Sequence, residues 1–449
     1  MNPDEIASLI VAEGEKLGAS DVSAIISEEK KHMLRFSNNS LTVLQTWNTI
    51  TPTIHVQIGS KRAGCALEDP TPVAITLAIE TLIKTMKLMR PGDVESRLPQ
   101  GPFTYRGVTD NYDRRVYSST DELTRAVETS IDSALNTGAK RVSGVLVATE
   151  WKRILETSTG SEGKECGTLL ELTVRAFVDA DSSGQGVSCS TTFQNFNPEV
   201  AGREAGTTAK LATGPAEGRE GVYRAVLGPL VMANLLNTAA SSASAHAVEI
   251  GMSYFAAKVG QEVASEKFTL IDDQQFPSGP GSHAFDDEGF PTRPTKIVDR
   301  GLLKTLLHSS YTAKKYNADL TGHGYYGGPS GIVPSPSNLI VDPGNCSTDE
   351  LFQEVNNGIY VTNNWYTRFQ NYSSGDFSTI CRDGVFMIVD GEIAGPVKGL
   401  RISDNMLRIM KSIQAISRDR KWIKWWEVET PILLSHFLVD GVKMTKSTS

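Results

Sequence analysis

The residues whose types could do chemistry stand at the end of one of the longest charge-free runs of the chain, residues 225–248. There the stretch NTAASSASAHAVE at 237–249 ends in His246 and Glu249, which are three residues apart and share one face if the segment is helical. A zinc-peptidase helix carries two histidines with a carboxylate beside one of them, and a further ligand elsewhere. His246 is the only histidine between residues 56 and 282. We therefore interpret it as a helix histidine hydrogen-bonded to its neighbour.

A second candidate is the segment LIDDQQFPSGPGSHAFDDEGFPTRPT at 270–295, where five acids crowd around His283 among turn residues. Carboxylates with turn geometry suit hard cations, but the ligand spacing of a calcium loop is missing. In the alternative that we favour, the acids accept backbone N–H bonds in tight turns and pair with Arg293 and Arg300. These acids are Asp272, Asp273, Asp286, Asp287 and Glu288.

Two further segments leave their alternatives open. The Gly- and Pro-rich stretch at 320–339 carries His323, Tyr325 and Tyr326, and it either lines a site or is a mobile connector. The stretch WIKWW at 422–426 holds three of the six tryptophans. If exposed it makes a partner surface, and if buried it forms a small satellite core.

Composition and charge narrow the class of protein. A chain of 449 residues exceeds what one hydrophobic core usually serves, so we expect two domains. The net charge of -8 argues against nucleic acid and anionic membranes as partners. Five scattered cysteines without a CxxC pair, and an acidic N-terminal helix without a secretory signal, predict a reduced, cytoplasmic protein. Polar residues interrupt the run at 225–248, which favours a buried soluble helix over a membrane span.

Hydrophobic periodicity predicts an α+β protein. Residues 1–90 form a helix–meander–helix unit, with strands at 22–26, 32–37, 41–46 and 51–59 and a second helix at 71–89. Further helices are predicted at 119–137 and 198–212. The second half is a largely antiparallel β domain led by one long buried helix over 229–259, with RDG (382–384) and VDGE (389–392) as hairpin turns. We place the domains at 1–221 and 222–449.

No P-loop, strand–GxGxxG–helix unit, GxSxG motif or kinase motif set occurs in the chain. Six ordered blocks in the second half nevertheless resemble the TldD/PmbA family, and the helix–meander–helix start is similar to its N-terminal domain. The blocks are KVGQEVASEKFTLIDD (258–273), FDDEGFPTRPTKIVDRGLLKTLLHSSYTAKK (285–315), TGHG (321–324), SNLIVDPG (337–344), SSGDFS (373–378) and GVFMIVDGEIAGPVKGLRIS (384–403). That family was once described as modulators of DNA gyrase and is now regarded as containing metallopeptidases.

The resemblance implies which branch of the family this chain is similar to. The TldD-type branch holds zinc with an HExxxH helix and a cysteine near the C-terminus, whereas the PmbA (TldE) branch lacks these residues and forms the partner subunit. The family register places the motif on Asn237, Thr238 and Ser242, and no cysteine occurs in residues 382–449. The resemblance therefore implies no catalytic residue and no metal ligand in this chain, with zinc in the partner subunit. The TGHG segment departs from the family's usual TGN, so no role is carried over to it.

Three hypotheses follow. The first is a non-catalytic PmbA/TldE-type subunit that pairs with a TldD-type zinc peptidase and helps to enclose an unfolded or leader peptide. The second is an independent hydrolase that uses His246 and Glu249, or His283 with the acidic cluster. The third is a homo-oligomeric peptide-binding protein without a peptidase partner. We also keep His246, Glu249, His283, Asp286, Asp287, Glu288 and His323 as candidate substrate or partner contacts.

Overall fold

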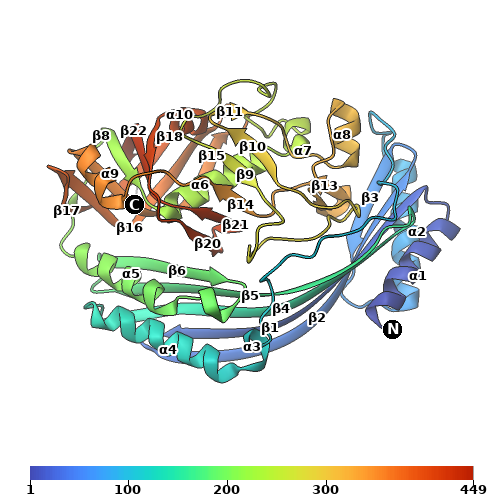
Figure 1. The fold of residues 1–449 in the computed structure, drawn as a ribbon, viewed down its shortest axis with the longest axis horizontal. Coiled ribbons are helices and arrows are strands. Elements are labelled where there is room, and N and C mark those ends of the chain that lie inside the picture. Colours follow the sequence, from blue (N-terminus) through green and yellow to red (C-terminus); the bar gives the residue numbers. More distant parts are fainter. Residues whose placement is uncertain (448–449) are drawn as a thin grey trace.

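The computed structural model describes residues 1–447, and its first half is built on one long, curved antiparallel sheet (Figure 1). The strand order is β3-β2-β1-β4-β5-β6. The strands are β1 (Asp21–Ser37), β2 (Ser40–Ile58), β3 (Lys61–Ala66), β4 (Arg141–Thr157), β5 (Glu162–Phe177) and β6 (Ser183–Ser190). The helices of this half are α1 (Pro3–Lys16), α2 (Pro72–Leu88), α3 (Arg115–Ser118), α4 (Thr120–Asn136) and α5 (Pro198–Leu211).

The helices cover one face of this sheet, and the second half of the chain packs on the other. Because side chains alternate along a strand, Val22, Ala24, Leu34 and Phe36 of β1 share a face. The first two pack with α1 and α2, and the last two pack with α4 and α5. Ile25 points to the opposite face and packs against Phe285 of the second half.

The predicted helix–meander–helix start is confirmed, but the four short strands were wrong because β1 and β2 are two long ones. The tight turn comes at Asn38 and Asn39, which both have positive φ, as the sequence predicts. The charged residues at 28–31 do not end β1, since it is paired on both sides there. Lys30 also lies 3.5 Å from Glu150 on the neighbouring strand.

The second half contains an eight-stranded sheet, a six-stranded sheet and a two-stranded one. Its strands are β7 (Ala216–Glu217), β8 (Gly221–Leu227), β9 (Leu270–Asp272), β10 (Thr295–Asp299), β11 (Leu302–Leu303), β12 (Gly324–Tyr326), β13 (Ile332–Pro334), β14 (Leu339–Val341), β15 (Gly358–Asn371), β16 (Asp376–Val389), β17 (Glu392–Lys398), β18 (Leu400–Asn405), β19 (Ile413–Ile416), β20 (Lys421–Trp425), β21 (Val428–Leu434) and β22 (Phe437–Lys446). Its helices are α6 (Pro229–Ser242), α7 (Ala245–Glu249), α8 (Ser310–Tyr316), α9 (Thr348–Val355) and α10 (Met406–Lys411). The α+β class with a largely antiparallel second half is confirmed.

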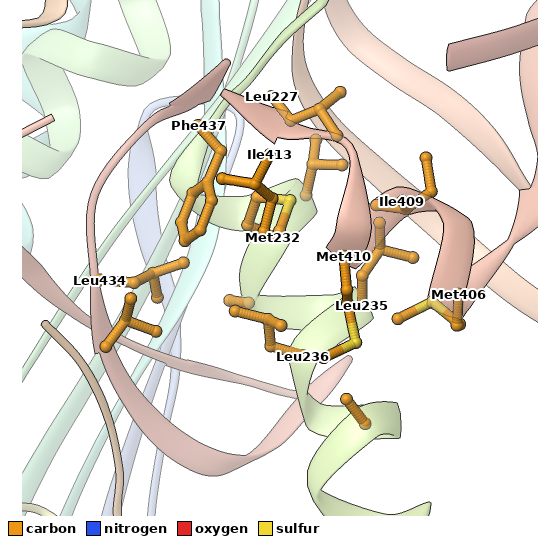
Figure 2. Packing of buried hydrophobic residues seen from close by; sticks show 14 of the residues in the cluster. Leu227, Met232, Leu235, Leu236, Met406, Ile409, Met410, Ile413, Leu434 and Phe437 are labelled. Atoms are coloured by element: carbon orange, nitrogen blue, oxygen red, sulfur yellow. The ribbon is translucent and has the colours of Figure 1, made fainter. Parts of the chain in front are cut away.

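Helix α6 runs through the core of this half, and Figure 2 shows Met232, Leu235 and Leu236 packed among residues of α10, β21 and β22. The prediction of one long helix over 229–259 was wrong, because the helix ends at Ser242. Ser244 leaves the helical conformation and forms a parallel bridge with Leu307, and its hydroxyl donates to the Pro334 carbonyl. Backbone bonds to Leu307 thus replace the helical ones.

The two predicted hairpins in the second half had different outcomes. Asp390 and Gly391 form the turn between β16 and β17, as VDGE predicts. The RDG prediction was wrong: Asp383 has a φ of 57°, yet it is an irregularity inside β16, and its carboxylate accepts from Arg175 of the first half.

The chain passes from the first-half sheet to the second-half sheets near the predicted domain boundary. Strand β7 at 216–217 already pairs with β17 of the second half, so the boundary at 221/222 stays a prediction. Residues 448–449 of the predicted second domain lie outside the described part. Within residues 1–447, no helix has both the length and the hydropathy that crossing a membrane requires.

Candidate functional site

A cleft of about 660 Å³ opens beside the C-terminal end of α6. One wall comes from residues 234–252, a second from residues 333–336 at the end of β13, and a third from β15 and the segment that joins β20 to β21. Its volume lies in the range typical of pockets that hold a small molecule or a few residues of a peptide. The lining residues discussed below are Asn234, Asn237, Thr238, Ser242, His246, Ile250, Met252, Tyr366, Thr367, Tyr372, Trp426, Glu427 and Thr430.

The three positions that the family register assigns to a zinc motif all line this cleft. The Asn237 amide donates to the Thr430 carbonyl at 3.0 Å and accepts from the Thr430 N–H at 2.9 Å, which joins α6 to β21. The Thr238 hydroxyl donates to the Leu235 carbonyl one turn earlier in the helix. Ser242 is buried at the end of the helix. The polar side-chain atoms of Asn237 and Thr238 are therefore hydrogen-bonded within the protein.

The residues at the three motif positions do not fit a zinc ion. Zinc takes imidazole, thiolate and carboxylate ligands, usually three or four of them. Asn237, Thr238 and Ser242 offer only neutral oxygen and amide groups. Among residues 1–447, no group of three or more His, Cys, Asp or Glu side chains is arranged to hold a metal ion.

His246 lies on the cleft wall and contacts Glu249 as its spacing predicts, with Nδ1 3.3 Å from Oε2. Glu249 turns away toward Lys315 at 2.8 Å and the Tyr311 hydroxyl at 3.2 Å. Hydrogen bonds from Lys315 and His246 hold the pKa of Glu249 below its ordinary value despite its partial burial. This carboxylate is thus a paired anion at a helix end.

Below the cleft lies a polar network that the sequence did not predict. The Asn234 amide oxygen accepts from Asn364 and Thr367, and its nitrogen donates to Glu427 at 3.1 Å. The other oxygen of Glu427 accepts the N–H of Tyr366 at 3.2 Å. These bonds tie α6, β15 and the segment before β21 together, and they leave the carboxylate of Glu427 engaged.

Large apolar side chains stand exposed on the rim of the cleft. Trp426 is 60% exposed, and Tyr366, Tyr372, Ile250 and Met252 are each more than 40% exposed. The segment WIKWW is divided: Trp425 is buried in the main core of the second half, not in a satellite core, whereas Trp426 stands on the rim, and its use as a partner surface stays a prediction. Clustered exposed aromatic residues mark binding surfaces more often than scattered ones do.

The acidic segment lies elsewhere, against the inner face of the first-half sheet. Asp287 and Glu165 each lie 2.5 Å from Arg153 of β4, and all three side chains are at least 90% buried. The Glu165 carboxylate accepts a hydrogen bond from Nδ1 of His283 at 3.0 Å. The charge of Arg153 is therefore matched inside the protein by two carboxylates, one from each half of the chain.

The neighbouring acids accept hydrogen bonds from backbone N–H groups, as we favoured from the sequence. Asp286 accepts from Glu288, Phe290 and Gly324, and Glu288 accepts from the N–H and hydroxyl of Ser310. Burial raises the pKa of Asp286 well above its ordinary value and that of Glu288 to about 7.

The predicted pairing of these acids with Arg293 and Arg300 was wrong. Arg293 donates to the Leu320 carbonyl, and among the described residues neither arginine pairs with an acid. The arginine that pairs with Asp287 is Arg153, 134 residues earlier in the chain. Such a long-range pair leaves no local signal in the sequence.

One part of the loop at 320–339 lines the cleft, and another part is buried away from it. Residues 333–336 line the cleft. His323 is fully buried, its Nδ1 2.9 Å from the Thr321 carbonyl and its Nε2 3.4 Å from Asp272, outside hydrogen-bonding geometry. The structure thus brings Asn237, Thr238, Ser242 and His246 together in the cleft, whereas the acidic segment and His323 lie outside it.

A family model described as the PmbA/TldA metallopeptidase C-terminal domain matches residues 220–446. A metalloprotease of Methanothermobacter thermautotrophicus is 29% identical over 296 residues, which are 63% of this chain and 64% of that protein. A metalloprotease of Methanocaldococcus jannaschii is 31% identical over 205 residues, 44% of each chain. The aligned part is less than two thirds of the length of either relative.

Two solved structures have the same fold over nearly the whole chain. TldE from Thermococcus kodakarensis aligns with a TM-score of 0.86 at 19% identity and covers 98% of this chain and 100% of that one. A Thermotoga maritima protein named as a modulator of a DNA gyrase aligns with a TM-score of 0.85 at 24% identity, with 98% and 100% coverage. At this identity the likeness establishes the fold alone.

Proposed function

This chain belongs to the PmbA/TldD family, and from that premise we propose that it is the non-catalytic, TldE-type subunit of a cytoplasmic zinc metalloprotease complex. The observation that carries the proposal is the cleft at the end of α6. Its three positions in the zinc-motif register hold Asn237, Thr238 and Ser242, none of which is a zinc ligand of the usual kind. Without the metal there is no Lewis acid and no water of lowered pKa, so this chain needs a TldD-type partner for hydrolysis.

In this proposal the cleft holds an unfolded or extended peptide while the partner cuts it. The exposed rim of Trp426, Tyr366 and Tyr372 supplies flat apolar surface for side chains of varied sequence. The network of Asn234 and Glu427 fixes the walls, so the cleft exists before the peptide arrives.

The test compares the purified chain alone with the chain mixed with a sister protein that carries HExxxH and a C-terminal cysteine. Bound zinc is measured by mass spectrometry, and cleavage is followed with a fluorogenic unstructured peptide. We expect zinc and cleavage only when the sister protein is present. Stoichiometric zinc with cleavage by the lone chain, lost in His246→Ala, would instead support the independent hydrolase.

A second measurement tests the peptide contact directly. In the mixture, Trp426→Ala should weaken binding of a labelled unstructured peptide by about tenfold, since an aromatic anchor contributes about 1–2 kcal/mol. Tyr372→Ala and Tyr112→Ala form a matched pair, because both tyrosines are similarly exposed and only Tyr372 lines the cleft. Equal peptide affinity for these two variants, together with an unaffected Trp426→Ala, would contradict the assigned cleft.

A further inference from the structure

Strand β2 has an unpaired edge over most of its length. On one side it pairs with β1 from Ser40 to Gln57. On the other side β3 pairs only with residues 53–58, and among residues 1–447 no strand pairs with that side of residues 40–52. The blue hairpin of β1 and β2 thus carries a free edge along the long sheet (Figure 1).

The direction of the backbone groups on this edge follows from one hydrogen bond. The Pro52 carbonyl accepts from the N–H of Leu67, on the β3 side, so it points away from β1. Because N–H and C=O groups alternate along a strand, those of Leu44, Thr46, Asn48 and Ile50 also point outward. The edge therefore offers a regular row of donors and acceptors to a neighbouring strand.

Between the bulge at residues 41–43 and Pro52, the edge lacks the usual protection against pairing. Native edge strands carry lysines, inward charges or bulges that keep other strands away. Residues 38–60 contain no Asp, Glu, Lys or Arg. Leu44 is 51% exposed, and Val43 and Ile50 are 40% and 39% exposed. An uncharged edge with exposed apolar side chains is suited to burial against another strand.

We propose that a second copy of this chain pairs its β2 edge antiparallel to this one, on a two-fold axis at Trp47. In that register Leu44 lies opposite Ile50 of the second copy, and Thr46 lies opposite Asn48. The four outward residues of each strand then form about eight main-chain hydrogen bonds across the axis. The two six-stranded sheets become one continuous sheet.

Self-complementarity points to a second copy as the occupant of this edge. Over residues 44–50, reversal of the strand about Trp47 places Leu44 opposite Ile50, polar Gln45 opposite polar Thr49, and Trp47 opposite itself; just beyond, Val43 falls opposite Thr51. Cross-strand aromatic and aliphatic pairs of this kind stabilise antiparallel sheets, and no like charges meet. The edge belongs to the first-half sheet and the cleft to the second half, so the pairing is independent of the role proposed for the cleft.

Cysteine cross-linking tests the register. Trp47 falls on a non-hydrogen-bonded pair, where Cα atoms lie about 4.5 Å apart and a disulfide can form. In a Cys166→Ser background, which removes the exposed native thiol, mild oxidation should link Trp47→Cys to itself. Gln45→Cys and Thr49→Cys should each stay unlinked alone and should link when mixed. The parent Cys166→Ser chain is the control and should stay unlinked.

Charge substitution tests the pairing without relying on oxidation. The chain alone should have twice its 48.7 kDa mass in light scattering. Leu44→Lys with Ile50→Lys, and separately Leu44→Glu with Ile50→Glu, should each raise the dimer dissociation constant by about tenfold or more. An equimolar mixture of the two double variants should recover the dimer, which also shows that both are folded. A monomeric parent chain, a mixture that does not recover, or cross-linking of Trp47→Cys only to a different protein would overturn the proposal.

Discussion

The cleft beside α6 and the acidic cluster around Arg153 differ in both solvent exposure and charge. The cleft is open, its α6 wall is lined by neutral hydroxyl and amide groups, and its rim carries exposed aromatic residues. The acidic cluster is rich in carboxylates, yet it is closed, and Asp286, Asp287 and Glu288 are each less than 10% exposed. The carboxylates that suggest a catalytic or metal site in the sequence therefore hold the two halves together. The accessible cleft is lined instead by residues that carry no catalytic motif.

The largest effect is expected from breaking the acidic cluster. Arg153→Met removes the guanidinium that lies between Glu165 and Asp287, so buried Asp287 loses its ion-pair partner and Glu165 keeps the His283 imidazole alone. We expect the free energy of unfolding in urea to fall by about 3–5 kcal/mol. Lys164→Met is the control, because its exposed pair with Asp4 should contribute less than about 1 kcal/mol. Equal stability of the two variants would mean that the cluster does not join the halves.

The second prediction concerns pH and Glu288. Burial raises its pKa from 4.5 to about 7 in the folded protein, so the proton is held more tightly there than in the unfolded chain. This contribution to stability is complete below about pH 4.5 and is lost as the pH rises through 7, with a loss of up to about 3 kcal/mol. Glu288→Gln should therefore gain stability relative to the wild type between pH 4.5 and 7.

The comparison with Glu288→Gln removes the contribution of the buried histidines, which titrate in both proteins. Burial lowers the pKa of His55 and His436 to about 3 and that of His308 to about 4, so these residues stabilise the fold increasingly as the pH rises toward 6.5. That opposite slope is common to both proteins and cancels in the difference. Parallel stability curves from pH 4.5 to 7 would show that Glu288 does not hold its proton.

A smaller effect is expected at the cleft wall. Asn237→Ala loses both hydrogen bonds to the Thr430 backbone and should lower the free energy of unfolding by about 1–2 kcal/mol. Thr238→Ala is the matched neighbour, since its hydroxyl bonds only within α6, and it should cost less than about 0.5 kcal/mol. A cost at Thr238 equal to that at Asn237 would show that Asn237 does not fasten α6 to β21.

The difference between local and long-range contacts decides which features could be predicted from the sequence alone. Features that depend on neighbours in sequence were predicted, such as the Asn38–Asn39 turn and helices α2 and α5, each with a proline near its start. The hydrogen bond of His246 with Glu249 was predicted for the same reason.

Features set by distant partners were missed. The helix breaks at Ser244 because Leu307 pairs with it, and α6 is joined to β21 because Asn237 bonds to Thr430, 193 residues away. Nothing within a local window of the sequence specifies these partners. The exposed tryptophan of WIKWW is a similar case, because only the fold decides that Trp425 turns inward and Trp426 outward.

The smallest effect is expected at His246, the residue that first suggests catalysis. Its bond to Glu249 is 3.3 Å long and partly exposed, and Glu249 keeps Lys315 and Tyr311 when the imidazole is gone. His246→Ala should therefore change the free energy of unfolding by less than about 0.5 kcal/mol. Peptide cleavage by the mixture with the sister protein should stay at the wild-type rate, because the hydrolytic metal is expected in the other subunit. A loss of zinc or of turnover in this variant would show that His246 of α7 takes part in metal binding or hydrolysis, and would contradict the assignment of the cleft as non-catalytic.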